Sequence, residues 1–96
     1  MNNGNLNNKI CLICRRKLEQ PFDKHHIIPK SKGGKKTILI HRICHSKIHS
    51  VLTENQLKNN YNTVEKIVSV PEINEFIKWV SNKPPGFYKR TKRKRN

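Results

Sequence analysis

The stretch HHIIPKSKGGKKTILIHRICHSKIH, residues 25–49, holds all five histidines of the chain and one of its three cysteines. Cys11 and Cys14 lie a short distance upstream. Eight side chains that can bind metal therefore fall within residues 11–49, which is more than one tetrahedral ion can use. The sequence predicts two metal sites with different tasks.

The first predicted site is a structural zinc site. Such a site takes four thiolate or imidazole ligands, which usually come from two short knuckles. Cys11 and Cys14 have the Cys-x2-Cys spacing, and His41 and Cys44 have the same spacing further along the chain. We therefore predict that these four residues bind one zinc ion.

Two other uses of the cysteines remain open. A Cys2His2 finger would pair the two upstream cysteines with His45 and His49, but it expects about 12 residues between the pairs. Here residues 15–44 make that interval 30 residues long, and His41 and Cys44 would have no role. Ordinary buried thiols or a disulfide are the second alternative. Three cysteines at metal-binding spacing favour a reducing compartment, for which we predict the cytoplasm.

The remaining histidines predict a catalytic metal ion. His45 and His49 are four residues apart, so on a helix their imidazoles share a face and can bind one ion together. An ion held by two or three histidines keeps positions for water and substrate. One of His25 and His26 can complete this set, and the other, on the opposite side of a strand, is free to act as a base. The alternative is that all four are ordinary surface or core histidines, which their gathering near a zinc framework disfavours.

The same stretch predicts the order strand, loop, strand, helix, which would bring His26 and the His45–His49 pair to a common cleft. The apolar residues at 27–28 and at 38–40 suit two strands, of which the first carries the paired histidines and the second spans residues 37–40. Gly33 and Gly34 supply positive backbone dihedrals for the reversal between the strands. A helix is predicted over residues 44–51.

These residues resemble an HNH endonuclease, a member of the ββα-metal family of DNA-cutting enzymes, and in particular the small stand-alone bacterial type. The resemblance rests on CLIC at residues 11–14, HHIIPKSKGG at 25–34 and HRICHSKIH at 41–49. Short segments further downstream are similar to the tails of such proteins. The resemblance implies a small α+β fold with a ββα-metal core, a structural zinc knuckle pair and C-terminal helices.

The resemblance also implies a role for each histidine outside the zinc site. His25, His45 and His49 would bind the catalytic divalent ion, and His26 would be the general base. The implied activity is that of a divalent-metal-dependent DNA endonuclease, which hydrolyses phosphodiester bonds to 5′-phosphate and 3′-hydroxyl ends. The expected cofactors are a structural Zn²⁺ and a catalytic Mg²⁺ or another divalent transition metal.

One position departs from the family pattern. The asparagine that gives the family its middle letter would fall nine residues before His45, where this chain has Lys36 followed by Thr37. The Thr37 hydroxyl can pin the loop in its place, and the metal site then relies on histidines alone. The departure bears on the rigidity of the loop more than on the chemistry.

The charge of the chain predicts a polyanionic partner, and we expect DNA. The chain has 21 Lys and Arg residues and six Asp and Glu residues, which give a formal net charge of +15 in 96 residues. These positive side chains repel one another unless a partner supplies negative charge. No apolar stretch approaches the roughly 18 residues of a membrane-spanning helix, so no membrane partner is predicted. We also predict no small-molecule cofactor. The residues predicted to contact nucleic acid are Lys30, Lys32, Lys35, Lys36, Lys47, Lys89, Arg90, Lys92, Arg93, Lys94 and Arg95.

The length and the hydrophobic content of 33% predict one small domain with a thin core, which a structural zinc would stabilise. We divide the chain into four parts. These are a flexible polar arm at residues 1–9, a zinc-stapled nuclease core at 10–52, C-terminal helices packing on the core at 53–83, and a basic tail at 84–96.

Capping signals predict three helices after the core. Thr53 and Gln56 can form a capping box, Thr63 can cap a second helix, and Pro71 suits the first turn of a third. The predicted helices span residues 53–61, 63–68 and 71–82. Apolar residues of the last helix recur at helical spacing and are predicted to pack in the core. They are Ile73, Phe76, Ile77 and Val80, with Trp79 beside them.

A zinc module that only binds nucleic acid is the alternative function. It explains the charge and the predicted zinc site as well as a nuclease does. It does not explain the four histidines outside the zinc site, and the presence of Lys36 in place of the family asparagine is the one feature in its favour.

Overall fold

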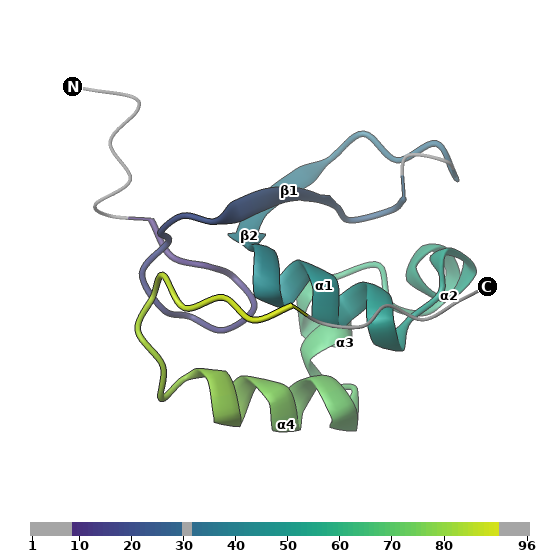
Figure 1. The fold of residues 1–96 in the computed structure, drawn as a ribbon. Helices are drawn as coiled ribbons and strands as arrows, with labels where there is room; N and C mark the ends of the chain where they lie inside the picture. The colour runs from purple at the N-terminus through teal and green to yellow at the C-terminus, as the bar shows by residue number, and fades with distance from the viewer. Residues whose placement is uncertain (1–8, 30–31, 91–96) are drawn as a thin grey trace.

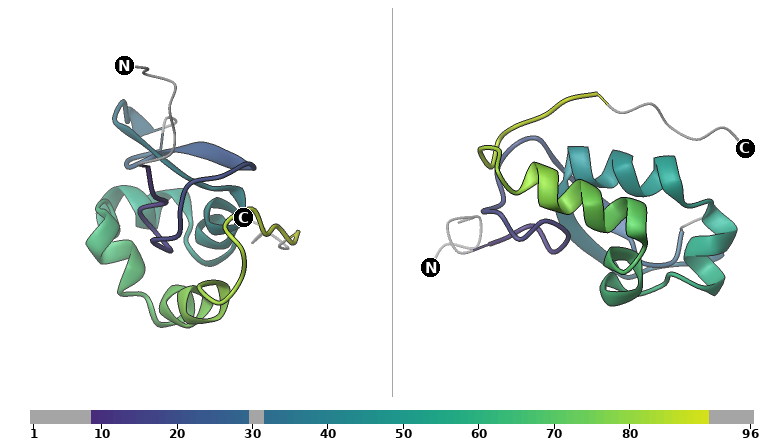
Figure 2. Two further views of the ribbon diagram at one scale, coloured as in Figure 1. Left: turned by 90° about the vertical axis from the view of Figure 1, so that its left-hand side faces the viewer. Right: turned by 90° about the horizontal axis from the view of Figure 1, so that it is seen from below.

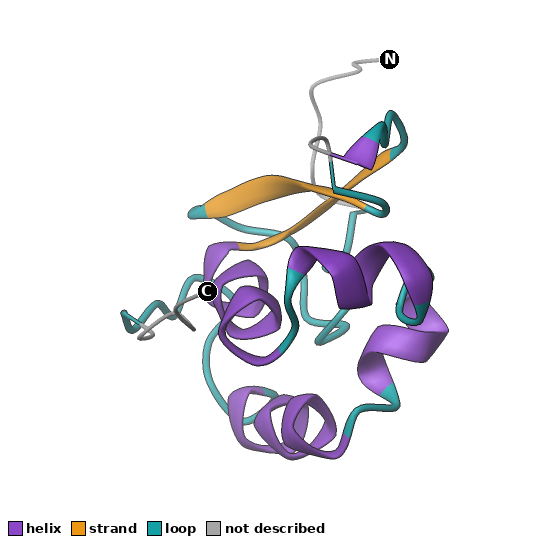
Figure 3. Ribbon diagram, turned by 90° about the vertical axis from the view of Figure 1, so that its right-hand side faces the viewer, coloured by secondary structure: helices purple, strands orange, loops and turns teal. Residues whose placement is uncertain are grey.

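In the computed structural model, which describes residues 9–29 and 32–90, two antiparallel strands lie on one side of a layer of helices (Figures 1 and 3). The first helix lies against the strands, and the last helix lies on the side of the first that faces away from them (Figure 1). The elements, in chain order, are β1 (Phe22–His26), β2 (Thr37–His41), α1 (Arg42–Val51), α2 (Glu54–Asn59), α3 (Val64–Val68) and α4 (Pro71–Val80). This arrangement confirms the predicted small α+β fold with a strand–strand–helix core.

The register of the hairpin decides which side chains face α1. His25 lies opposite Ile38, and His26 lies opposite Thr37. Because successive residues of a strand point to opposite faces, Asp23 and His25 share one face of β1 and His26 lies on the other. His25 is only 1% exposed, so the two neighbouring histidines have different surroundings.

The loop between the strands begins two residues earlier than the sequence predicts. Strand β1 ends at His26, so residues 27–28 belong to the loop, although the Ile27 N–H still donates to the Lys36 carbonyl at 3.0 Å. Gly33 has the predicted positive φ, +87°, but the prediction of a positive φ at Gly34 is wrong. Gly34 is needed for close approach instead, because a Cβ there would lie 1.6 Å from the Ile28 carbonyl oxygen.

The helices begin close to where their capping signals predict. The Thr53 hydroxyl accepts from the Gln56 N–H and the Gln56 side chain accepts from the Thr53 N–H, so the predicted capping box is present. The Thr63 hydroxyl caps α3 by accepting from the Lys66 N–H. The first helix begins at Arg42, two residues before the prediction, because β2 passes into it directly after His41. Helices α2 and α4 each end two residues before the prediction.

The core joins the cysteine-bearing segment at residues 11–18 to the helices and to β2. Its fully buried apolar side chains include Leu18, Ile40, Ile43, Ile48, Leu57, Ile67, Ile73 and Val80. The apolar stripe of α4 packs there as predicted, with Ile73 and Val80 buried and Phe76 and Ile77 partly buried against the core. Trp79 is 43% exposed. No helix in the described ranges is long and apolar enough to span a membrane.

Candidate metal centres and active site

Two segments distant in sequence bring the predicted zinc ligands together. Residues 11–14 form a tight turn, closed by a hydrogen bond from the Arg15 N–H to the Cys11 carbonyl at 2.8 Å, and Arg15 itself has a left-handed φ of 68°. His41 ends β2 and Cys44 lies in the first turn of α1. The His41 N–H donates to the Cys11 sulfur at 3.4 Å, which links the cysteine turn to this strand-to-helix junction. Figure 2 shows the purple segment that contains the turn from two further sides.

The four ligand atoms have the spacing of a tetrahedral site. All four side chains are buried, and their donor atoms lie within 4.8 Å of one another. The Cys11 and Cys44 sulfurs are 3.8 Å apart, and the Cys14 sulfur is 3.3 Å from Nδ1 of His41. Zinc–sulfur bonds of about 2.3 Å in a tetrahedron place two sulfurs about 3.8 Å apart. The three cysteines are free, and the group fits a structural zinc ion.

The electrostatics of this group favour a cation. Hydrogen bonds with Cys11 and then Cys44 lower the pKa of the Cys14 thiol, whereas hydrogen bonds with Cys11 and Cys14 raise the pKa of Cys44. Burial by itself would lower the pKa of His41, but hydrogen bonds with the two upstream thiols outweigh it and raise that pKa to about 9. Thiolate character is therefore concentrated at one buried point, where a divalent cation would neutralise it.

Neighbouring groups orient His41 and Cys14. Nε2 of His41 lies 2.9 Å from the Lys17 carbonyl oxygen and 3.2 Å from the Glu19 N–H. With Nδ1 bound to zinc, Nε2 would carry the proton and donate to the Lys17 carbonyl, as metal-binding histidines commonly do. The Arg16 Nε donates to the Cys14 sulfur at 3.3 Å. Sequence reasoning did not single out Arg16, since an arginine beside a knuckle has no distinctive spacing.

A second group of histidines lies between β1 and α1. Donor atoms of His25, His45 and His49 lie within 4.8 Å of one another, and their ring centroids are 4.8 to 5.7 Å apart. Both ring nitrogens of His25 are buried without a hydrogen-bond partner. Burial, and next the nearby His45 and His49, lower the pKa of His25 to about 3. Its imidazole is therefore neutral near pH 7, the form that binds metal.

A carboxylate orients this group, and it was missed in the sequence. Asp23 Oδ2 accepts from Nδ1 of His45 at 3.1 Å, and its other oxygen accepts from the Arg42 Nε at 3.1 Å. This contact leaves Nε2 of His45 for an ion. The signal was present, because Asp23 lies two residues before His25 and a strand places both on one face. Its partners come from the following helix, which no local pattern reveals.

His26 lies outside the three-histidine group. It ends β1, is partly buried, and sits on the strand face opposite to His25. Within the described part of the chain, the metal-capable group at this place comprises His25, His45 and His49 only. The structure thus gathers His25 with His45 and His49, while the predicted cleft shared by His26 with His45 and His49, and the role of His26 as a base, stay predictions.

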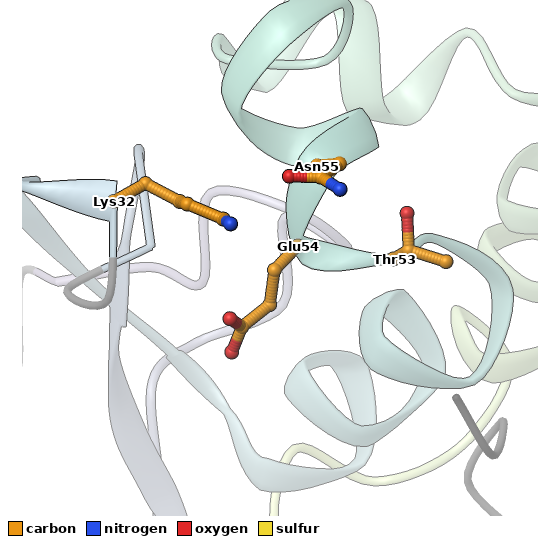
Figure 4. Close-up of a pocket in the computed structure, with 4 residues that line it drawn as sticks. All are labelled: Lys32, Thr53, Glu54 and Asn55. Atoms are coloured by element: carbon orange, nitrogen blue, oxygen red, sulfur yellow. The ribbon is translucent and has the colours of Figure 1, made fainter.

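The lysines predicted to contact nucleic acid fall in different places. Lys32 points across a gap toward the start of α2, where it lines a pocket of about 320 Å³ with Thr53, Glu54 and Asn55 (Figure 4). Lys47 lies two residues from both His45 and His49 in α1, which turns it about 200° from each. Lys35, Lys36, Lys89 and Arg90 are exposed. Residues 1–8 of the predicted arm, and Lys30, Lys92, Arg93, Lys94 and Arg95, lie outside the described residues.

Comparison with known proteins places this site in a family. The model of the HNH endonuclease family matches residues 11–51, which contain both metal-capable groups. An uncharacterized protein of Bacillus subtilis (strain 168), YisB, is 34% identical over 86 residues, which cover 88% of this chain and 85% of that protein. No solved structure matches the chain significantly. The chain belongs to the HNH endonuclease family.

Proposed function

We propose that this protein is a divalent-metal-dependent DNA endonuclease. The observation that carries the proposal is the buried, neutral His25, which has two unpartnered ring nitrogens and a donor atom within 4.8 Å of those of His45 and His49. A buried polar group without a partner costs about 1–3 kcal/mol, so such an arrangement persists when it has a ligand to bind. Membership of the HNH family supports nuclease chemistry in this protein.

Each residue of the site has a part in phosphodiester hydrolysis. His25, His45 and His49 would hold Mg²⁺ or another divalent metal ion, which when bound supplies positive charge for the phosphate and the leaving oxygen. Asp23 keeps Nδ1 of His45 engaged, and so fixes the orientation of that ring. His26 takes a proton from water, the water oxygen attacks phosphorus, and the 3′ oxygen leaves.

Basic residues around the hairpin loop would hold the DNA backbone. The exposed Lys35 and Lys36 lie in the loop between the strands, and the Lys32 amine points toward the start of α2 (Figure 4). Contacts of this kind fix the position of a strand without reading its sequence. The net charge of +15 favours binding of any DNA at low salt.

A plasmid cleavage assay tests the proposal. Purified zinc-loaded protein is incubated with supercoiled DNA and Mg²⁺, Mn²⁺, Co²⁺ or Ni²⁺, and the product ends are mapped. We expect metal-dependent cleavage with 5′-phosphate and 3′-hydroxyl ends. DNA binding without cleavage under every ion would instead identify a nucleic-acid-binding zinc module.

Substitution of His26 tests the assigned base. His26→Ala should lower the cleavage rate by roughly 10²-fold or more, the scale of a lost general base, and leave DNA affinity unchanged. Lys24→Ala is the matched control, because Lys24 is exposed on the same strand face two residues earlier. If His26→Ala cuts as fast as Lys24→Ala, another group is the base.

A further inference from the structure

An exposed aromatic cluster lies on α4 and the segment after it. The Trp79 ring is 6.0 Å from the Phe76 ring and 5.7 Å from the Phe87 ring, measured between centroids. Trp79 is 43% exposed, and Tyr88, directly after Phe87, is 42% exposed. Clusters of exposed aromatic side chains commonly mark binding sites on a protein surface. This cluster is therefore a candidate binding site.

Lysines flank the aromatic cluster at both ends. The Lys47 amine lies 5.9 Å from the Phe76 ring centroid. The Lys83 amine lies 5.1 Å from the Trp79 centroid and 5.6 Å from the Phe87 centroid. An open groove of about 490 Å³ lies beside Phe76 and Trp79. Its lining residues are Lys47, Pro71, Glu72, Glu75, Phe76 and Trp79.

The cluster is held in place from the zinc knuckle. Arg16, which donates to the Cys14 sulfur, also donates to the Pro84 carbonyl at 2.5 Å. The Phe87 N–H in turn donates to the Pro84 carbonyl at 2.9 Å, which folds the segment back toward α4. The aromatic rings are thus preorganised, and preorganisation lowers the entropy lost on binding.

The surface lies away from the histidine group. Helix α4 lies on the side of α1 that faces away from the strands (Figure 1), and Lys47 is on the side of α1 opposite to His45 and His49. A nucleic acid bound here therefore occupies a second place on the molecule. The proposal below does not depend on cleavage at the metal site.

We propose that this aromatic cluster binds unpaired nucleotides of a single-stranded segment. Aromatic side chains stack on exposed bases and neighbouring lysines contact phosphates, which is how sequence-independent single-strand sites work. The exposed Lys89 and Arg90 continue the basic surface beyond the rings. In duplex DNA the bases are stacked on one another, so a duplex offers this site only its phosphates.

The two acidic residues of the groove indicate how a bound strand would be oriented. Glu75 is 3.6 Å from the Lys78 amine, and Glu72 is exposed on the first turn of α4. They disfavour phosphates on their side of the groove, whereas carboxylates accept hydrogen bonds from exocyclic amines such as that of cytosine. Bases therefore face the acids, and the phosphates lie toward Lys47 and Lys83.

The intrinsic fluorescence of the protein reports on this site directly, because Trp79 is the only tryptophan in the chain. Full-length zinc-loaded protein, without added divalent ions, is titrated with a single-stranded 12-nucleotide oligodeoxycytidine. An abasic oligonucleotide of the same charge and a 12-base-pair duplex are titrated in parallel. We expect saturable quenching by the oligodeoxycytidine, and at least tenfold weaker binding and little quenching with the other two.

Variants test the same contact with a labelled oligodeoxycytidine and fluorescence anisotropy. Trp79→Ala should weaken binding by roughly 5- to 150-fold, the range of one stacked base. Lys83→Ala, which removes an amine beside the rings of Trp79 and Phe87, should weaken binding more than Lys66→Ala, which removes an exposed lysine of α3. Zinc content and circular dichroism verify that each variant is folded.

Two results would overturn the proposal. Equal affinity for the abasic and the cytidine strands would show that only charge is recognised. A Trp79 emission maximum that shifts with protein concentration, with no quenching by any oligonucleotide, would show that a second copy of the chain covers the surface. Neither result depends on cleavage, so the proposed nuclease activity would remain to be judged by its own assay.

Discussion

At the scale of single residues, Asp23 determines how His45 is presented to a metal ion. Its carboxylate joins His45 of α1 and Arg42 at the start of the same helix to strand β1. A ring hydrogen-bonded through Nδ1 can bind metal only through Nε2, and its rotation is restricted. The orientation of the histidine group therefore depends on a residue outside the three ligands.

Removal of this carboxylate should weaken metal binding by the three histidines but not abolish it. We expect Asp23→Ala to lower the affinity of zinc-loaded protein for Mn²⁺ or Co²⁺ by roughly 10- to 100-fold, the usual effect of losing such a partner, as measured by calorimetry. Arg42→Ala is the control, because it leaves the contact between Asp23 and His45 in place. Unchanged affinity in Asp23→Ala would mean that the carboxylate does not orient the ligand.

At the scale of elements, both metal-capable groups draw residues from the hairpin and α1. Loss of the metal ion from each group should nevertheless affect the protein differently. His41 and Cys44 flank the point where β2 passes into α1, and His45 and His49 lie further along that helix. One helix thus contributes to a closed group in the core and to a partly open group beside it.

Metal analysis of two variants should separate these groups. Cys11→Ser should lose bound zinc and unfold, since structural zinc contributes folding free energy directly. His49→Ala should keep its zinc and its circular dichroism spectrum but lose cleavage. Zinc retained in Cys11→Ser, or lost in His49→Ala, would contradict the assignment of the ligands.

The loop between the strands offers a second prediction at this scale. Gly34→Ala places a Cβ against the Ile28 carbonyl, so the backbone must shift and the free energy of unfolding should fall clearly. Gly33→Ala meets open space and costs only the strain of a left-handed residue, about 1–2 kcal/mol. Chemical denaturation of both variants measures the difference. A smaller loss for Gly34→Ala than for Gly33→Ala would refute the close-approach explanation.

At the scale of the whole molecule, the dominant property is the positive charge. Phosphate contacts by lysine and arginine release condensed counterions, so affinity falls with salt in proportion to the number of contacts. Six of the cations lie within residues 89–96. The proposed basic tail is therefore expected to add affinity for every DNA sequence alike.

Deletion of residues 89–96 tests this expectation. The slope of log affinity against log salt should flatten by several units, at roughly 0.9 per lost contact on duplex DNA, and cleavage at low salt should persist because no proposed catalytic residue lies there. Binding to a duplex at several salt concentrations measures the slope. A truncated protein with the slope of the full chain would show that the tail makes no phosphate contacts.

Local patterns in the sequence were enough to predict several parts of the structure. The capping residues Thr53 and Thr63 predicted the starts of α2 and α3, because a cap needs only residues three positions apart. Cys-x2-Cys spacing and the His45–His49 interval predicted which side chains gather, because knuckles and helix faces have fixed spacings. The motif order predicted the strand–strand–helix core and the family.

Contacts between distant segments were decided only by the tertiary structure. The pairing of Asp23 with His45, the anchoring of Pro84 by Arg16 and the exposure of Trp79 each involve elements far apart in the chain. Gly34 likewise serves a close approach to Ile28 that a turn signal does not disclose. Spacing along a chain determines which side chains share a face, but which faces meet depends on how the elements pack, and that depends on the whole core.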